Sequence, residues 1–559
     1  MSRNFVGELL IFLLFFIGSL DTKVLSNILS LGDGSVFEMK LTNLHDTVPY
    51  MKQASIAANS KATFNVTNVS SSASFIIFQI HIYQHNVTLS FDKDYLNKVS
   101  NRSIFGSNIG LLFKLTADTT QLFIKNDNVH NVMALLVVIA YNNNAPIPGG
   151  CNMEFNTEIA PYARIQTRDT MVIVDVQPAS LSFNSSCENV SVEVEMYQMF
   201  LPEQDLTAET YFMGIVNMLT VQDIKNNGAK VMTSIDFSPM RRIFSAYIGV
   251  GSVYAAVASY ENYSAAYVPI FSYSCNPAID PVSCDILSES VLKFISAVCF
   301  FLGLFFTFLG HRFPRTEKMF PIFFIGTVIG YAMEGSVITG LAIGLLFNLL
   351  SLICPYSAER PYSVLFVNTT LGLFFACVAY LYSPGSFTFL QNNAVFWILF
   401  ATLALSVTLV ATFYSFSHLT CSIFSSFAII LPIDYWVGSS LKYIVINIVR
   451  RATVEDFNLA IVQPPIQSKD IWLIAFWIYL AVYHFYKHWQ NRESLNPTET
   501  MTERTPLRNQ IDVPDRLITT DPDIITNYRY IYHYLLTRIR FWRYRSVQSE
   551  TFCNAIHQR

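Results

Sequence analysis

Residues 293–310 read KFISAVCFFLGLFFTFLG, and this run opens the part of the chain that decides its fold. A helix that crosses a bilayer needs about 20 consecutive, mostly apolar residues. Further apolar runs of comparable length follow, which predicts an all-α membrane domain of seven helices over residues 290–490. The seven runs are residues 293–310, 319–334, 337–355, 362–382, 395–416, 418–434 and 471–488.

The second and third runs nearly merge, since only Glu334–Ser336 separates them. A single helix over residues 319–355 would be far longer than the hydrocarbon core and would need an extreme tilt. We therefore predict a tight helical hairpin that turns at Gly335.

The composition of the whole chain agrees with a membrane protein that also has a large polar part. Of 559 residues, 52% are hydrophobic and 14% are charged, and the mean hydropathy is +0.36. Soluble domains carry about 25% charged residues, so an ordinary cytosolic enzyme is excluded. The balance of 36 Lys and Arg against 40 Asp and Glu excludes a strongly basic nucleic-acid binder.

The first 20 residues are typical of a signal peptide. Arg3 supplies a positive start, Leu9–Ile17 is a short apolar core, and Gly18 and Ser19 are small residues near a cleavage point. An uncleaved N-terminal anchor is the alternative, because Glu8 is unusual so close to the apolar core. Either interpretation exports the segment that follows.

Residues 21–289 have the pattern of a β-rich, sandwich-like ectodomain, which we divide into units at 21–160 and 161–289. Short alternating or β-branched runs separated by Asn- and Ser-rich turns predict several strands. These runs are residues 75–83, 133–140, 171–176, 190–196, 248–260 and 265–273. One helix is expected at residues 207–224, where a Thr precedes an acidic first turn.

The ectodomain carries seven Asn-x-Ser/Thr sequons, which agree with export and predict glycans in surface loops. They are Asn65, Asn68, Asn86, Asn101, Asn184, Asn189 and Asn262. A further sequon at Asn368 lies inside an apolar run and should be unused.

Four cysteines in the exported part predict two disulfides. They are Cys151, Cys187, Cys275 and Cys284. Four cysteines allow three pairings, and sequence order favours Cys151–Cys187 and Cys275–Cys284. No tight pair and no His at ligand spacing supports a zinc site at these cysteines. The remaining five cysteines are expected to be free thiols.

Charge predicts the orientation, with the N-terminus outside or lumenal and the C-terminus cytoplasmic. The first loop, His311–Lys318, has three basic residues and one Glu, as a cytoplasmic loop should. The tail, residues 491–559, is also rich in Arg. The loop Asp434–Asp470 fits less well, because it would lie outside and yet carries four basic residues.

Residues 528–544 of the tail mix aromatic and basic side chains without an acid. Such a segment is expected to lie on the anionic cytoplasmic leaflet. Its basic residues are Arg529, Arg538, Arg540 and Arg543. An ordinary solvated tail is the alternative, and binding to nucleic acid is not expected on a membrane-tethered chain.

Residues 435–449, in the loop after the sixth run, are apolar except for Lys442. They predict either a re-entrant or interfacial helix, with Tyr435, Trp436 and Tyr443 as headgroup anchors, or an ordinary helix that covers the bundle.

Few ionisable residues fall inside the apolar runs. Glu334 and Asp434 are the candidate polar membrane residues, although both are expected near the outer interface, where charge is tolerated. His484 and His488 share one helix face and could bind a metal, but no acid in the mid-membrane stretches completes such a site. We therefore predict no catalytic residue, no metal and no cofactor.

Three functions remain open. A non-enzymatic receptor or regulator, which would bind an unknown extracellular ligand or protein, is favoured because catalytic motifs of soluble enzymes are absent. The alternatives are a channel or transporter and, with less support, a metal-dependent intramembrane hydrolase. The Asp/Glu-Arg-Tyr and Asn-Pro-x-x-Tyr landmarks of G-protein-coupled receptors are missing.

Several stretches in order along the chain resemble the transmembrane 7 superfamily member 3 family, within a wider group that includes transmembrane protein 198. They are Ser74–His81, Asn86–Phe91, Pro146–Phe155, Tyr197–Thr207, Gly310–Glu317 and Ile433–Phe457. The resemblance implies a seven-span, glycosylated protein of the plasma membrane or secretory pathway. It also implies a role in cell survival and in damping folding stress of the endoplasmic reticulum. It supplies no ligand, reaction or catalytic residue.

Overall fold

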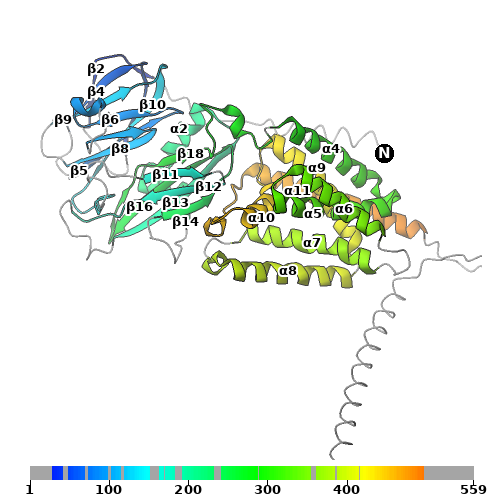
Figure 1. Ribbon diagram of the computed structural model, residues 1–559. Coiled ribbons are helices and arrows are strands. Elements are labelled where there is room, and N and C mark those ends of the chain that lie inside the picture. Colours follow the sequence, from blue (N-terminus) through cyan, green and yellow to red (C-terminus); the bar gives the residue numbers. More distant parts are fainter. Residues whose placement is uncertain are drawn as a thin grey trace, which may run out of the picture. The chain divides into compact units, whose positions relative to one another are not determined.

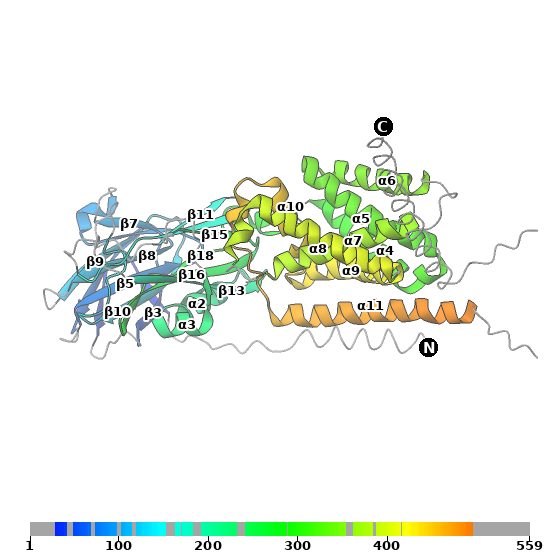
Figure 2. The same ribbon diagram turned by 90° about the horizontal axis from the view of Figure 1, so that it is seen from below.

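The computed structural model describes residues 28–495, apart from 42–47, 69–72, 98–101, 115–118, 152–162, 169, 183–191, 232–240, 288, 354–360, 384–386 and 415. The predicted signal peptide, the basic tail segment with its four arginines, Asn101, Asn184, Asn189 and Cys187 lie outside the described residues. Figures 1 and 2 show the strands gathered in one part and helices α4 to α11 in another.

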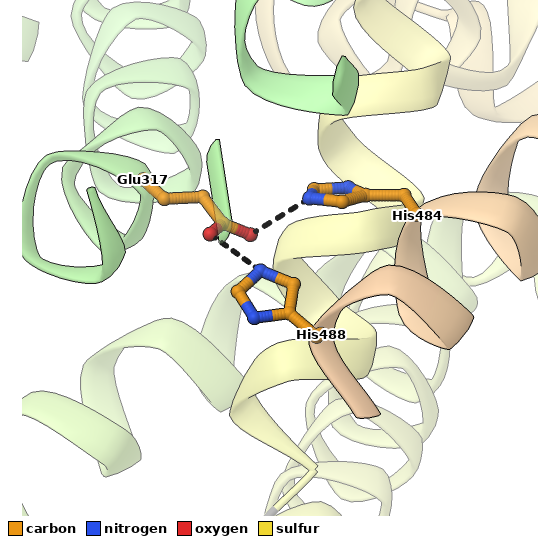
Figure 3. Close-up of side chains that lie close together, drawn as sticks. All are labelled: Glu317, His484 and His488. Carbon is orange, nitrogen blue, oxygen red and sulfur yellow. Dashed lines mark hydrogen bonds and ion pairs between the residues drawn. The ribbon is translucent and has the colours of Figure 1, made fainter. Parts of the chain in front are cut away.

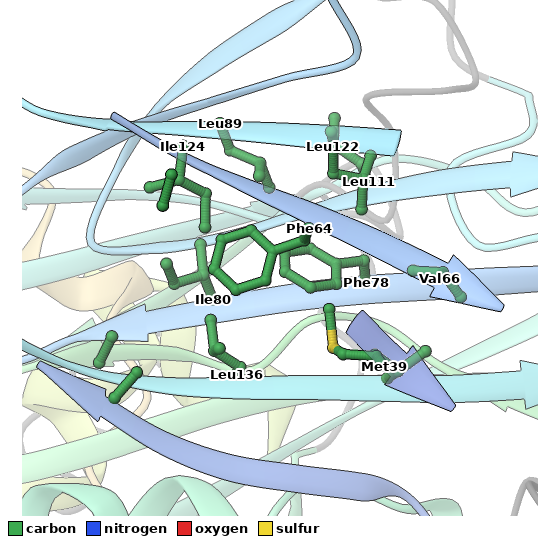
Figure 4. Packing of buried hydrophobic residues seen from close by; sticks show 14 of the residues in the cluster. Met39, Phe64, Val66, Phe78, Ile80, Leu89, Leu111, Leu122, Ile124 and Leu136 are labelled. Atoms are coloured by element: carbon green, nitrogen blue, oxygen red, sulfur yellow. The ribbon is translucent and has the colours of Figure 1, made fainter. Parts of the chain in front are cut away.

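Two five-stranded sheets form the first β unit, with strand orders β1-β3-β10-β5-β8 and β2-β4-β9-β6-β7. Their facing side chains enclose an apolar core, in which Phe64 of one sheet contacts Phe78 of the other with ring centroids 5.8 Å apart (Figure 4). This is the face-to-face packing of a sandwich. The strands are β1 (Leu29–Leu31), β2 (Ser35–Lys40), β3 (Tyr50–Ile56), β4 (Ser60–Thr67), β5 (Phe75–Ile82), β6 (Val87–Ser90), β7 (Ser103–Gly106), β8 (Asn108–Lys114), β9 (Thr119–Asn126) and β10 (Val132–Tyr141).

Strand β5 is buried along its whole length, which explains its nearly continuous apolar sequence FIIFQIHI. Phe78 and Ile80 point into the core of the first unit, whereas Phe75 and Ile77 belong to a second apolar layer shared with the next unit. A strand covered on both faces needs no polar alternation. The two β units therefore pack together through this sheet.

The second β unit contains two further sheets, ordered β11-β12-β15 and β14-β13-β16-β17, with β18 also paired to β16. Helices α2 and α3 pack into the apolar layer shared by the two units. The elements are β11 (Ala163–Arg168), β12 (Met171–Val176), β13 (Glu193–Glu203), α2 (Ala208–Val216), α3 (Val221–Asn227), β14 (Ala229–Val231), β15 (Arg241–Ser245), β16 (Val250–Tyr260), β17 (Tyr263–Ala266) and β18 (Ile270–Ser272).

Two predicted elements of this unit are each divided in the structure. The helix expected at residues 207–224 is wrong as a single element: α2 ends at Val216, and Thr220 caps α3 by accepting from the backbone N–H of Asp223 at 3.1 Å. The strand expected at residues 265–273 is split into β17 and β18.

Each of the seven predicted apolar runs coincides with a helix. These helices are α4 (Ser290–Leu309), α5 (Pro314–Glu334), α6 (Val337–Ile353), α7 (Pro361–Leu381), α8 (Asn393–Phe413), α9 (Ser417–Val437) and α11 (Ser468–Leu495), with the shorter α10 (Tyr443–Thr453) after α9. Within the described residues, four helices are long and apolar enough to cross a membrane, at Ser290–Arg312, Val364–Leu381, Asn393–Phe413 and Ser417–Val437. A seven-span bundle thus stays a prediction.

Helices α5 and α6 form the hairpin that the sequence predicts. Gly335 follows α5 with φ of +71°, a left-handed conformation that favours glycine at a helix end. A Cβ added at Gly326 would lie 3.0 Å from the Cα of Gly344, and one at Gly330 would lie 3.0 Å from the Cα of Gly340. Small residues at these positions let the two backbones approach closely, as in membrane helix pairs.

Candidate functional site

A buried ionic cluster joins the ectodomain to the helices. The ammonium of Lys442, in the turn between α9 and α10, lies 2.8 and 3.0 Å from the carboxylate oxygens of Glu203 at the end of β13. It also lies 3.6 Å from Oδ2 of Asp434 in the last turn of α9. The three side chains are 8%, 4% and 0% exposed, respectively. Because buried charges must be paired, this junction cluster ties a β strand to two helices.

Backbone groups hold the turn that carries Lys442. The same Oδ2 of Asp434 accepts from the backbone N–H of Lys442 at 3.0 Å, and Asp470 in α11 accepts from the N–H of Ser440 at 2.6 Å. Gly438 has φ of +70°, and a Cβ there would meet Glu203 at 3.2 Å. The junction cluster therefore places one ammonium between two carboxylates, and Asp470 holds the turn that carries it.

Helix α10 packs against the ectodomain through residues of both its first and its last turn. The ring of Tyr443 meets Tyr247 edge to face at 4.6 Å, and Arg450 donates to the carbonyl of Ala246 at 2.6 Å. Downstream of the helix, Ile461 pairs with Phe244 in a parallel β bridge. This segment therefore covers the helices on the side of the ectodomain.

These contacts correct the predicted headgroup anchors. Tyr443 is buried between protein elements, so it does not serve as an anchor. Tyr435 is half-buried and donates to both carboxylate oxygens of Asp285, at 2.8 and 3.0 Å. Trp436 is 79% exposed, as an anchor would be.

Of the two candidate polar residues, the structure brings only Asp434 into the junction cluster. Its carboxylate is fully buried, so the structure corrects the expectation that this charge is tolerated because it lies at the interface with water. Glu334 is exposed next to the hairpin turn, where it accepts from the hydroxyl of Thr339 at 2.5 Å. In the sequence, the feature that indicates the cluster is Lys442, the one charged residue in the apolar stretch 435–449. No sequence pattern pairs it with Glu203.

Burial raises the pKa of Glu203 from 4.5 to about 7, although the nearby ammonium of Lys442 works against this shift. A carboxyl group with a raised pKa in the folded state contributes stability below pH 4.5 that is lost as the pH rises through 7. The difference between these pKa values corresponds to about 3 kcal/mol. The junction cluster can therefore take up or release a proton near neutral pH.

This proton equilibrium predicts a measurable pH dependence. Glu203→Gln, which mimics the protonated form, should be nearly as stable as the wild type at pH 5 and more stable than it at pH 8. Melting temperatures of purified protein at the two pH values test this. Glu193→Gln on the exposed part of the same strand should keep the wild-type dependence. Equal pH slopes for the wild type and Glu203→Gln would contradict the raised pKa.

A second buried polar cluster, the histidine–glutamate cluster, lies further along α11. The helix rises 1.5 Å per residue, so His484 is about 21 Å along the helix from Asp470. Nε2 of His488 is 2.7 Å from one carboxylate oxygen of Glu317 in α5, and Nε2 of His484 is 3.5 Å from the other (Figure 3). The expectation that no acid accompanies these histidines is wrong. The sequence places Glu317 in a charged loop, whereas in the structure it lies in the first turn of α5 and is 1% exposed.

The predicted cysteine and glycan sites have separate places in the ectodomain. Cys275 and Cys284 form a disulfide, and Cys151 is also disulfide-bonded. The pairing of Cys151 with Cys187 stays a prediction. Among the described sequons, Asn68, Asn86 and Asn262 are exposed and Asn65 is half-buried. Asn368 is fully buried in α7, where its amide donates to Thr412 at 3.3 Å.

Three family models match the chain in order. The model described as TM7SF3-like, N-terminal immunoglobulin-like domain matches residues 42–141, and TM7SF3-like, second immunoglobulin-like domain matches residues 146–278. The TM7S3/TM198-like domain matches residues 296–489. The helices described above thus fall in a domain whose relatives are transmembrane proteins.

Named relatives match over most of the chain. Transmembrane 7 superfamily member 3 of Homo sapiens is 29% identical, over 74% of this chain and 77% of the human protein. The protein of the same name from Rattus norvegicus is 28% identical, over 74% of this chain and 78% of the rat protein. With two TM7SF3-like immunoglobulin-like domains followed by the TM7S3/TM198-like domain, this chain is similar to transmembrane 7 superfamily member 3 over most of its length.

Proposed function

We propose that this protein is a non-enzymatic, receptor-like membrane regulator. In this proposal, a ligand-induced change in the ectodomain alters the conformation of the helices through the junction cluster. The observation that carries the proposal is the buried contact of Lys442 with Glu203 and Asp434. A buried ammonium loses much of its stabilisation if one carboxylate moves away. A ligand that shifts the end of β13 would therefore change the energy of the turn between α9 and α10.

The proposal includes seven membrane spans, with the N-terminus outside or lumenal and the C-terminus cytoplasmic. The support is the match of all seven apolar runs to helices and the basic loop between α4 and α5. The Cys275–Cys284 disulfide and the exposed sequons agree with an exported ectodomain. The plasma membrane or the secretory pathway would be the site of action.

We further propose the roles implied by the family resemblance, which are support of cell survival and damping of folding stress in the endoplasmic reticulum. An extracellular or lumenal partner would bind the ectodomain. The tail would associate with anionic lipid headgroups through its basic segment, since clustered Arg next to a membrane favours such lipids.

The test is a rescue experiment with Glu203→Gln. Cells that lack the endogenous protein would receive the wild type, Glu203→Gln or Glu193→Gln at matched levels, and survival would be scored under thapsigargin. Tunicamycin is unsuitable because it would also remove any glycans from the sequons. We expect the wild type and Glu193→Gln to protect the cells and Glu203→Gln to protect them clearly less. Equal protection by all three chains, including equal export, would rule out transmission through the junction cluster.

A further inference from the structure

The histidine–glutamate cluster has the donor set of a transition-metal site. It combines two imidazoles from α11 with one carboxylate from α5, and the three donor atoms all lie within 4.8 Å of one another. His484 and His488 are four residues apart, so both rings project from the same face of the helix. Figure 3 shows the two rings facing the carboxylate from one side.

Unsatisfied polar atoms in this cluster indicate that it can bind a ligand. Among the described residues, neither ring nitrogen of His484 has a hydrogen-bond partner, and Oε1 of Glu317 has none either. Both residues are almost fully buried, at 0% and 1% exposure. Leaving a buried donor or acceptor unpaired destabilises the folded state. A bound cation would satisfy the carboxylate oxygen and one nitrogen of the ring together.

The spacing between His484 and Glu317 also fits a metal better than a hydrogen bond. Nε2 of His484 and Oε1 of Glu317 are 3.5 Å apart, at the limit of hydrogen bonding. With ligands about 2.0–2.1 Å from zinc, neighbouring donors in a tetrahedral site are about 3.3 Å apart. His488 is hydrogen-bonded to the other oxygen at 2.7 Å, and a metal would replace this bond and move the two atoms about 0.6 Å further apart.

The surroundings provide further donors. The ring of His418, from the first turn of α9, has its centroid 4.8 Å from that of His488, and the ring of His311 lies 6.4 Å away. The buried thiol of Cys421 in α9 lies next to the Glu317 carboxylate. Imidazole, carboxylate and thiol are ligands that zinc accepts, whereas magnesium and calcium prefer oxygen.

We propose that Glu317, His484 and His488 form a binding site for Zn²⁺, which fastens α5 to α11 at the end of the helical domain away from the junction cluster. Three protein ligands leave one position for a fourth donor from the neighbouring side chains or for water. The bound zinc would have a structural role, since it links α5 to α11. The proposal is therefore independent of the proposed receptor-like function.

The first test measures zinc in the wild type. Full-length protein, purified in detergent with a tag that contains no histidine, should hold about one zinc per chain by mass spectrometry of metals. After removal of metal with a chelator, adding ZnSO₄ should raise the melting temperature by about 3–6 °C, whereas MgCl₂ should not. Absence of both bound zinc and zinc-dependent stabilisation would overturn the proposal, and this result needs no variant to fold.

The second test assigns the zinc to these residues. Loss of outer-sphere partners alone weakens metal affinity about 10–100-fold, so His484→Ala or Glu317→Gln should weaken zinc binding by at least that factor. His130→Ala, at an exposed histidine of the ectodomain, is the matched control and should keep the wild-type affinity. Wild-type zinc content in folded His484→Ala would place the metal elsewhere and would also overturn the proposal.

Discussion

Lys442→Met is expected to lower the free energy of unfolding by about 3–5 kcal/mol at pH 8. The substitution keeps the length of the side chain but removes the ammonium that lies between Glu203 and Asp434. Two buried carboxylates then remain without a cation, which is far costlier than losing a pair at the surface. Chemical or thermal unfolding of the purified protein measures the effect.

The size of the loss should depend on pH. Without Lys442 the two buried carboxylates can lose their uncompensated charge only by binding protons. The variant should therefore lose less free energy of unfolding at pH 5 than at pH 8. In the double variant Lys442→Met with Glu203→Gln, part of the lost stability should return. Lys293→Met, at an exposed lysine that pairs with the half-buried Asp285, is the control and should cost less than about 1 kcal/mol. Similar losses for Lys442→Met and Lys293→Met would show that the junction cluster contributes little.

Arg451→Met should be the next most damaging change, with an expected loss of about 3 kcal/mol. The guanidinium is buried and donates to the carbonyl of Leu390 at 2.5 Å and to Oδ1 of Asn393 at 3.2 Å. It also lies 4.0 Å from the centre of the Phe396 ring. Removing it takes the donor away from Leu390 before α8 and from Asn393, the first residue of α8, and so breaks this connection of α10. Unfolding of the purified protein is again the measurement.

Arg451→Lys separates charge from geometry at this position. A lysine keeps the positive charge but cannot serve several acceptors with a planar fork or stack on Phe396 in the same way. We expect it to recover less than half of the stability lost in Arg451→Met. Full recovery by lysine would mean that charge alone matters, contrary to the contacts described.

Local patterns explain why much of the fold could be predicted. The helical hairpin at Gly335 follows from two apolar runs separated by a glycine, and β5 follows from a short apolar run next to turn residues. The break between α2 and α3 was missed because Thr220 lies inside an otherwise helical pattern, and only its capping bond reveals the new helix start. Hydrophobic periodicity reports the kind of element better than its ends.

The two buried clusters are formed by residues that lie far apart in the sequence, so the sequence did not reveal which residues belong to them. The bond of Lys442 to Glu203 spans a sequence separation of 239, and that of His488 to Glu317 spans 171. Glu317 has the sequence surroundings of a charged loop, and nothing local distinguishes it from Arg315 or Lys318.

The sequence by itself determined the order of a β-rich, exported part and an apolar helical part, because burial in a sheet or in lipid leaves a periodic or continuous apolar pattern along the chain. Only the tertiary structure decided that Asp434 is covered by the ectodomain and that Glu317 meets two histidines. The physical reason is that a buried charge is stable only when an oppositely charged or hydrogen-bonding group contacts it. Packing of helices and strands that are distant in the sequence brings that group into contact, and a local sequence pattern does not predict such packing.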